Sequence, residues 1–347
     1  MRQIDFLDIV RQAWYAFDRQ RPLSSVSDIS AKVSTNHVYR AERSNGDILI
    51  AKLSFFGKYE HFEEDHAIIN ELAQLLSPPY EQVLANSLTR YGKLFTYRHQ
   101  EKDLDIWVVF YLPVDIQRRV PKKLKEADVP KLGAEIARFH AACDSVVEFL
   151  PPSSKGMASD LQDLKNYLNS DQGLFRYHGY ASYLVDQCDQ LLEALQTPMF
   201  EALKAIPVFV DWNIGNFSLT EDWRLYSRWD YDWFRMSSRT MDFYFFSRVV
   251  SEGGDQTVFS YVLEPLLADR FVSFLKAYHA VFPLTEGEIR FIKEAYRFFI
   301  LHYVINFGEH FFHSMYANRL QQEACEKYLP ELERSFEVER LLSILSP

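Results

Sequence analysis

The segment from Phe209 to Asp242 decides the fold, and it reads FVDWNIGNFSLTEDWRLYSRWDYDWFRMSSRTMD. The apolar run from Ile206 to Val210 predicts a short buried strand, with Asp211 at its end. A polar turn follows, and the stretch from Leu225 to Trp229 predicts the returning strand. Asp230 therefore also comes at a strand end, and we expect the two acidic side chains to share one rim of this hairpin.

Asp211 and Asn216 have the D-x-x-x-x-N spacing of a kinase catalytic loop, and Asp230 follows one hairpin later. In phosphoryl transfer the first Asp accepts or orients the hydroxyl proton, the Asn holds Mg²⁺, and the later Asp joins Mg²⁺ to the phosphates. Turn-forming Asp and Asn residues are common after strands, so the spacing alone would favour an ordinary turn. Further matches elsewhere in the chain favour the catalytic interpretation.

These matches make the chain similar to the aminoglycoside phosphotransferase and choline kinase family, whose members are small-molecule kinases. The family's HGDxxxxN loop resembles FVDWNIGN, its metal motif resembles WDYDW at Asp230, and its D-L-A helix start resembles the sequence around Asp242. LGAEIARFHAACD, from Leu132 to Asp144, resembles the family's L-G-x-x-L-A-x-L-H helix. The similarity extends from about Ser34 to Phe246, and the combination is more specific than any one motif.

The resemblance implies an α+β, bilobal, protein-kinase-like fold. Its small β-rich N-terminal lobe, which binds nucleotide, would span residues 1–113, and its larger, mainly helical catalytic and substrate-binding lobe residues 114–347. The length agrees, because 347 residues exceed one typical hydrophobic core. A hydrophobic content of 48% can fill a sizeable core.

The resemblance also implies a nucleotide site in the first lobe. Asn36 falls in the family's N-x-V-Y strand, and Lys52 falls on the next strand, where the family places the lysine that contacts the α and β phosphates. Glu64, on a predicted helix, is the expected partner of Lys52, with Glu63 and Glu71 as alternatives.

The apolar run from Asp105 to Pro113 predicts a buried strand. In the family this strand leads to the hinge where adenine pairs with backbone groups, which makes Phe110, Tyr111 and Leu112 hinge candidates. A plain core strand is the alternative, because backbone contacts leave no mark on side chains.

By the same resemblance Asp211 is the catalytic base, Asn216 and Asp230 are ligands of Mg²⁺, and Asp242 supports the loop. The family's His and Gly before the base are Phe209 and Val210 here. An aromatic ring fills the volume of His but loses its polar contact, and Val is less suited than Gly to a tight backbone approach.

The expected activity is an ATP- and Mg²⁺-dependent transfer of phosphate to a hydroxyl of a small molecule, such as an amino alcohol, a sugar or an aminoglycoside. Trp212, Asp232 and Glu309 are weak candidates for a pocket that would suit an amine-bearing alcohol, although aromatic side chains are more often core. A pseudokinase that acts as a binding module and a kinase with a protein substrate are the alternatives. The sequence predicts no oligomeric state.

Composition excludes other classes of protein. A formal net charge of -10 argues against a nucleic-acid binder, which needs a basic surface. The three cysteines are widely spaced, which predicts neither a disulfide framework nor a zinc site and fits a reducing cytoplasm. The most apolar segments are interrupted by charged and polar residues, so no membrane span is expected.

Overall fold

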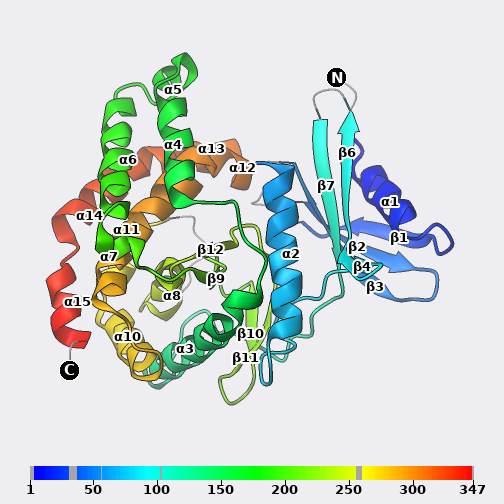
Figure 1. The fold of residues 1–347 in the computed structure, drawn as a ribbon, viewed down its shortest axis with the longest axis horizontal. Coiled ribbons are helices and arrows are strands. Elements are labelled where there is room, and N and C mark those ends of the chain that lie inside the picture. Colours follow the sequence, from blue (N-terminus) through cyan, green and yellow to red (C-terminus); the bar gives the residue numbers. More distant parts are fainter. Residues whose placement is uncertain (1–3, 31–36, 56, 102–103, 255–259, 346–347) are drawn as a thin grey trace. The chain divides into compact units, whose positions relative to one another are not determined.

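The computed structural model describes residues 4–30, 37–55, 57–101, 104–254 and 260–345 (Figure 1). The chain forms two compact units. The first comprises residues 1–115, 150–154 and 310–313, and the second comprises residues 116–149, 155–309 and 314–347. The first contains an antiparallel sheet and the second is mainly helical, so the α+β class predicted from the sequence is confirmed. The division into domains at residue 113 stays a prediction.

The first unit is built on a five-stranded antiparallel sheet in the order β1-β2-β3-β7-β6. A tight turn joins β2 to β3, and its Gly46 has a φ of +88°, a left-handed conformation that favours glycine. Asn45, Gly46 and Asp47 therefore form the hairpin turn between these two strands. The strands of this unit are β1 (Leu23–Asp28), β2 (His37–Arg43), β3 (Ile48–Ser54), β4 (Thr89–Arg90), β5 (Lys93–Leu94), β6 (Thr96–Glu101) and β7 (Leu104–Tyr111).

Two helices cover opposite faces of this sheet (Figure 1). Helix α1 (Phe6–Phe17) packs Trp14 edge-on against Phe110 of β7, with ring centres 5.5 Å apart. Helix α2 (Tyr59–Leu75) packs Phe62 against Trp107 of β7, with ring centres 5.8 Å apart. Trp107 is three residues before Phe110 in the strand, so the two side chains point to opposite faces of the sheet. Successive side chains of a strand point to opposite faces, so β7 is buried on both sides and its sequence is continuously apolar.

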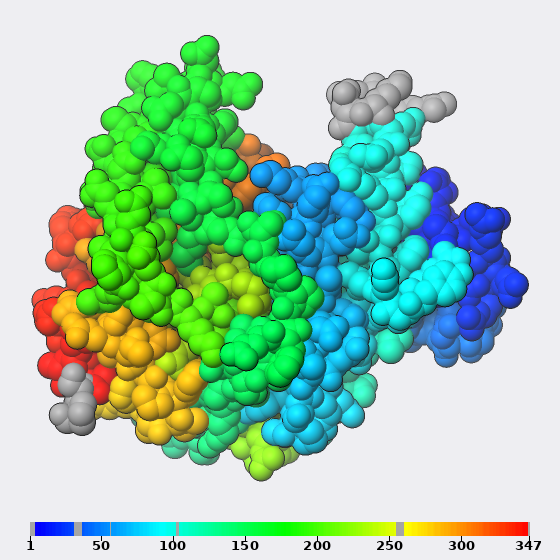
Figure 2. Space-filling view, in the orientation of Figure 1, coloured from blue at the N-terminus to red at the C-terminus, as the bar shows by residue number. Residues whose placement is uncertain are grey.

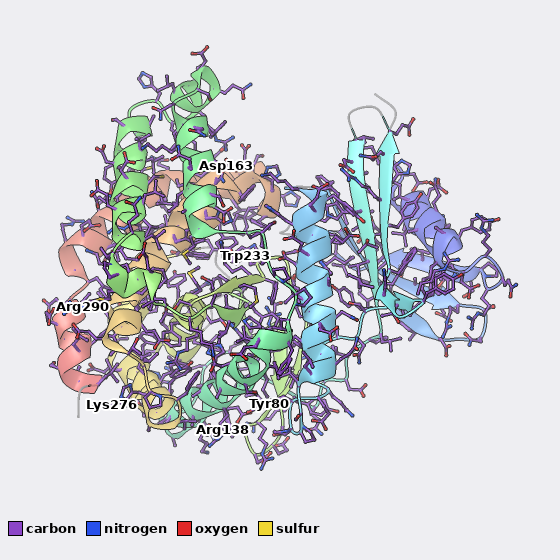
Figure 3. The ribbon with its side chains drawn as sticks, in the orientation of Figure 1. Tyr80, Arg138, Asp163, Trp233, Lys276 and Arg290 are labelled. Atoms are coloured by element: carbon purple, nitrogen blue, oxygen red, sulfur yellow. The ribbon has the colours of Figure 1, made fainter. Side chains whose placement is uncertain are left out.

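Helices α3 and α10 pack closely against each other in the second unit. Gly133 of α3 lies so close to α10 that a Cβ built there would be 2.3 Å from the carbonyl oxygen of Phe274. Figure 3 labels Arg138 on α3 and Lys276 on α10. In Figure 2, α4, α5 and α6 (green) stand together at one end of this unit. Among the described residues, no helix combines the length and the apolar character that crossing a membrane requires.

Helices account for most of the second unit. They are α3 (Val129–Val146), α4 (Met157–Leu168), α5 (Asp171–Arg176), α6 (Ala181–Leu195), α7 (Pro198–Glu201), α8 (Phe243–Val250), α9 (Glu264–Leu267), α10 (Asp269–Val281), α11 (Glu286–Phe299), α13 (Ser314–Glu323), α14 (Leu329–Ser335) and α15 (Val338–Leu345), while α12 (Gly308–Phe311) is shared with the first unit. Short 3-10 turns are η1 (Glu126–Asp128), η2 (Val147–Phe149) and η3 (Arg239–Asp242), and π-helical turns are η4 (Ile300–Asn306) and η5 (Ala324–Tyr328).

The segment from Phe209 to Asp242 contributes strands to two small antiparallel sheets. One has the order β11-β10-β8 and the other pairs β12 with β9. The predicted strand from Ile206 ends at Val208, because Val210 takes a φ of 58° and leaves the extended conformation. The strands are β8 (Arg118–Arg119), β9 (Ile206–Val208), β10 (Phe217–Leu219), β11 (Leu225–Arg228) and β12 (Arg235–Ser237).

Candidate active site

The loop that starts at Asp211 begins with two consecutive tight turns. The amide of Asp211 donates to the carbonyl of Phe209 at 2.6 Å, and the amide of Trp212 donates to the carbonyl of Val210 at 3.0 Å. Val210 has a left-handed φ of 58°, which is a true outlier for a β-branched residue. The chain therefore keeps at Val210 a backbone conformation that suits the glycine of the related motif.

Asp242, at the end of η3, holds this conformation in place. Its Oδ1 accepts hydrogen bonds from the amides of Phe209 at 3.0 Å and Val210 at 2.7 Å. Its Oδ2 lies 3.1 Å from Nε2 of His140 on α3, whose Nδ1 lies 2.8 Å from the hydroxyl of Tyr278 on α10. The residues that carry these five polar groups are all buried, so every partner matters to the free energy of the loop. These contacts are the ones that a loop-supporting role for Asp242 requires.

Asp211 is partly buried, and the charge of a second acid, Asp230, acts on it. Burial raises the pKa of Asp211 to about 7, and the charge of Asp230 adds to the rise, while the charge of Arg228 opposes it. Oδ1 of Asp211 accepts from Nδ2 of Asn213 at 2.5 Å and from the Asn213 amide at 3.3 Å. Asn213 thus orients the carboxylate, and a carboxylate with a pKa near 7 is suited to accept a proton near neutral pH.

Asn216 and Asp230 lie on neighbouring segments of the same site. The backbone carbonyl of Asn216 accepts from the amide of Trp229 at 3.0 Å, which brings Asn216 beside the strand end that leads to Asp230. Nδ2 of Asn216 donates to the carbonyl of Asp211 at 3.2 Å. Asp230 itself has a left-handed φ of 68°. These contacts bring Asn216 beside Asp211 and beside the strand end that precedes Asp230, and a common rim for the three side chains stays a prediction.

The donor types at this site suit a hard cation. The Asn216 hydrogen bond uses the nitrogen end of the amide, so the oxygen end is not consumed by it. An amide oxygen and the Asp230 carboxylate are ligands that Mg²⁺ prefers, and Mg²⁺ commonly takes only one or two protein ligands together with phosphates. No group of three or more His, Cys, Asp or Glu side chains arranged to hold a metal occurs among the described residues.

Lys52 lies on β3, which is the central strand of the first unit's sheet. It is 5% exposed, and it pairs in register with Val109 of β7. Cross-strand partners project from the same face, and Val109 has the parity of Trp107, which packs on α2. The Lys52 side chain therefore projects from the face of the sheet that α2 covers.

Asp65 is the acid on the buried face of α2. Ile68, Ile69 and Leu72 follow it by three, four and seven residues, all of them fully buried, and Asp65 itself is 7% exposed. The candidates from the sequence were Glu63, Glu64 and Glu71, and Asp65 was not among them. The same spacing rule, applied to every acid of the helix, identifies it.

Glu64 precedes Asp65 by one residue, so its side chain points away from the centre of that face. Its hydrogen-bond partner is Ser154. Its Oε2 accepts hydrogen bonds from the amide and the hydroxyl of Ser154, both at 2.8 Å. Ser154 belongs to the short segment 150–154 that packs with the first unit. These bonds engage one oxygen of the Glu64 carboxylate, the group that the sequence suggests as the partner of Lys52.

The predicted hinge residues already use backbone groups within the first unit. The carbonyl of Phe110 accepts from the amide of Leu88, and the amide of Leu112 donates to the carbonyl of Asn86, both at 2.8 Å. A nucleotide base would have to replace the second bond or use other backbone groups, so adenine contact at Phe110 and Leu112 stays a prediction. Asn36 lies outside the described residues.

The three weak substrate candidates lie in different surroundings. Trp212 is 0% exposed and packs against Phe139, Phe217 and other rings, so it is a core residue that no substrate reaches. Asp232 is partly buried just before Trp233, which Figure 3 labels.

Glu309, on α12, pairs with Arg176 of α5 at 2.5 Å and lines an open hollow of about 380 Å³. Asp232 follows Asp230 by two residues in the sequence.

Comparison with known proteins identifies the fold. No family model matches the sequence, and no curated protein does. Three of the solved structures that resemble the chain are an amicoumacin kinase in complex with AMP-PNP, Ca²⁺ and Ami (15% identity, 97% of this chain and 97% of that chain covered, TM-score 0.62), an aminoglycoside 2'-phosphotransferase-IIIa in complex with GDP (13%, 96% and 100%, 0.55) and a choline kinase from Streptococcus pneumoniae (15%, 94% and 99%, 0.53). The chain has the fold of these kinase-like phosphotransferases, as the sequence motifs predict.

Proposed function

We propose that the protein is an ATP- and Mg²⁺-dependent phosphotransferase that phosphorylates a hydroxyl group of a small molecule. The observation that carries this proposal is the loop geometry: Asp242 fixes the amides before Asp211, and Asp211, with a pKa raised to about 7, lies beside Asp230. The left-handed Val210 supports it further, because the loop keeps the required conformation without the family's His-Gly pair. A pseudokinase would have no need to keep this strained conformation.

In the proposed reaction the acceptor hydroxyl oxygen attacks the γ-phosphorus, and the bond from that phosphorus to the β,γ-bridging oxygen breaks. Asp211 takes the proton that the hydroxyl loses, and Asn213 keeps the Asp211 carboxylate turned for this transfer. Asn216 and Asp230 would hold Mg²⁺, which neutralises phosphate charge when it is bound. The leaving group is the nucleoside diphosphate.

Lys52 would contact the α and β phosphates from the first unit. We propose Asp65 as the acid that orients it, in place of Glu64, because Asp65 lies on the buried face of α2 and Lys52 projects from the face of the sheet that α2 covers. A buried ammonium needs such a partner, since an unpaired buried charge is costly.

The acceptor class follows from chemistry and from the named structural relatives. The relatives include kinases of choline, amicoumacin and aminoglycosides. We propose an acceptor that carries both a hydroxyl and an amine, such as an amino alcohol, an amino sugar or an aminoglycoside, with Asp232 as the acidic residue nearest in sequence to the site. The related structures hold AMP-PNP or GDP, and we propose ATP as the donor and the cytoplasm as the compartment.

The test compares wild type with Asp211→Asn and with Asp222→Asn, an exposed acid of the neighbouring hairpin turn. Slow hydrolysis of Mg-ATP gives a readout before the acceptor is known, and a screen of amino alcohols, sugars, aminoglycosides and proteins follows. We expect Asp211→Asn to bind Mg-ATP and to lose about 100-fold or more of the rate, since a positioned base contributes that much. Asp222→Asn should match wild type.

If hydrolysis is insensitive to Asp211→Asn and no acceptor is phosphorylated, the protein is a binding module and not a kinase. Phosphate transfer to a protein alone would replace the small-molecule acceptor with a protein substrate.

A further inference from the structure

Arg228, the last residue of β11, joins the two ends of the loop that carries the candidate base and metal ligand. Its Nη2 donates to the backbone carbonyl of Asp211 at 2.9 Å, and its Nη1 donates to the backbone carbonyl of Asn216 at 3.3 Å. The residue is 0% exposed. One planar group therefore bonds both loop residues whose side chains the proposed reaction uses.

Aromatic rings surround the guanidinium. Its central carbon lies 5.2 Å from the ring centre of Phe209, 5.1 Å from that of Trp212 and 5.9 Å from that of Tyr231. Such contacts stabilise a desolvated cation, most strongly over Trp. Phe209 stands where the related motif has His, so in this chain the ring before the base packs against a cation instead of offering a polar group of its own.

The position of Arg228 is set by these rings and the two carbonyls. In the part of the chain that the structure describes, its Nε has no hydrogen-bond partner. The carboxylates of Asp211 and Asp230 attract the guanidinium electrostatically. A buried cation that is held by loop carbonyls beside two acids is placed to act on the loop, since stability alone is served equally well by an apolar side chain.

We propose that Arg228 is a positioning residue that fixes Asp211 and Asn216 relative to each other. Its two parallel donors set the spacing of the two carbonyls, which a lysine with a single point of charge does not reproduce. Arg228 thereby supplies to the loop the support that Phe209 and Val210 do not. The effect on the loop stands on these contacts alone, and the effect on catalysis rests on the proposed function.

Arg270 of α10 provides a matched control. It is 8% exposed, and it too donates to two backbone carbonyls, from Nε to Val250 at 2.5 Å and from Nη2 to Leu124 at 2.7 Å. It pairs with Glu126, away from the loop. Arg270→Lys therefore loses the same kind of double contact as Arg228→Lys at a place where neither Asp211 nor Asn216 is held.

The first measurement is amide hydrogen exchange of the segment Phe209 to Phe217, followed by mass spectrometry on the full chain without nucleotide. We expect Arg228→Lys to exchange roughly tenfold faster than wild type in this segment, since local opening follows the loss of local contacts. Arg270→Lys should leave the segment unchanged and loosen its own surroundings. Equal exchange of the segment in both variants would overturn the proposal.

The second measurement is the steady-state hydrolysis of Mg-ATP. We expect Arg228→Lys to lower kcat by about tenfold or more with KM for Mg-ATP within about twofold, because misplacing the base costs rate more than binding. Arg270→Lys should keep the wild-type kcat. A wild-type kcat in Arg228→Lys would overturn the catalytic consequence.

Tyr231→Phe is the second variant if Arg228→Lys fails to fold. It removes the hydroxyl that donates to the Arg228 carbonyl at 2.7 Å and leaves the guanidinium in place. Amide exchange of the segment Phe209 to Phe217 should become faster and kcat should fall, and both changes should be smaller than in Arg228→Lys. If neither the exchange nor kcat changes, the result contradicts the proposal. Hydrolysis that Asp211→Asn does not lower would refute the proposed function, while the exchange comparison still decides the role of Arg228.

Discussion

Val210 places a β-branched side chain where the backbone is left-handed, next to the proposed base. Conformations of this kind cost about 1–3 kcal/mol and persist where surrounding contacts enforce them. The enforcing contact here is the hydrogen bond from its amide to Asp242 at 2.7 Å. The residue thus stores strain at the catalytic loop.

This strain is measurable against Val208, a valine of strand β9 that is equally buried at 0% exposure. Both Val→Gly changes remove the same buried side chain, but only Val210→Gly relieves the left-handed conformation. We expect Val208→Gly to lower the free energy of unfolding by about 1–3 kcal/mol more than Val210→Gly does. Denaturant unfolding of the two variants measures the difference, and equal losses would show that Val210 is unstrained.

Sequence alone suggests the residues whose proposed chemistry depends on spacing along the chain. Asp211, Asn216, Asp230 and Asp242 all lie within one segment, where a short motif fixes their separation. Arg228 escaped notice because its role depends on the backbone carbonyls that it reaches after the hairpin folds, and a backbone contact leaves no pattern in the sequence.

Asp65, the acid that we propose in place of Glu64, was not a candidate from the sequence for a reason that belongs to the helix as an element. The motif E-x-x-x-L selected Glu64, but the centre of the buried face lies one residue later, where Ile68, Ile69 and Leu72 converge on Asp65. The strands and helices themselves were predicted well, since apolar periodicity is local. The partner of each face is not local, and the Ser154 contact of Glu64 was therefore not predicted.

The packing of α3 against α10 provides a prediction at the scale of elements. Alanine at Gly133 would gain about 1 kcal/mol in helix propensity, but its Cβ would lie 2.3 Å from a backbone carbonyl oxygen of α10. Backbone cannot move aside cheaply, so we expect Gly133→Ala to destabilise the protein by about 1–3 kcal/mol net. Gly156→Ala, where the nearest atom is 3.4 Å away and is a serine hydroxyl, should have little effect in the same thermal unfolding assay.

A second prediction concerns the start of α11, where Glu288 pairs with Arg239 of η3 at 2.6 Å. Burial raises the pKa of Glu288, but the hydrogen bonds and charge of Arg239 outweigh burial, so its pKa lies below the usual 4.5. The unfolded chain therefore binds the proton more readily. The stabilisation is fully present above 4.5 and is lost as the pH falls through the folded-state pKa.

Glu288→Gln isolates this charge, because Gln also forms the capping box that Glu288 makes with Thr285. We expect the variant to be less stable than wild type by about 3 kcal/mol near neutral pH, as for other broken buried pairs. The difference in free energy of unfolding between wild type and variant should decrease as the pH falls below 4.5. A difference that does not change with pH would show that the carboxylate charge is not the source of the stability.

For the whole molecule, the prediction concerns ligand-linked stability. If Asn216 and Asp230 hold Mg²⁺ against nucleotide phosphates, ATP should raise the melting temperature more with Mg²⁺ than with a chelator. Asp230→Asn should lose most of this metal-dependent increment, and Asp222→Asn, which changes an exposed acid in the same hairpin, should keep it. Equal stabilisation of the wild type with and without metal would contradict the metal assignment.

Lys52→Ala tests the proposed phosphate contact of the first unit by the same measurement of melting temperature. Lys52 should contribute to nucleotide affinity, so its loss should reduce the shift that Mg-ATP produces. Asp65→Asn should reduce the shift as well, while Glu64→Gln, which keeps an acceptor for Ser154, should not. The reverse order of these two effects would return the role to Glu64.

The buried polar groups from Asp242 through His140 and Tyr278 to Arg239 and Glu288 connect the amides of the catalytic loop to the first turn of α11. One hydrogen-bond network therefore connects the loop to the start of the helix, although Arg239 and Glu288 are 49 residues apart in the sequence. Evolution or engineering that alters the first turn of α11 also alters the catalytic loop, even where the changed side chain touches neither nucleotide nor acceptor. Variation in turnover among descendants of this chain should then concentrate at positions that a search limited to the loop would overlook.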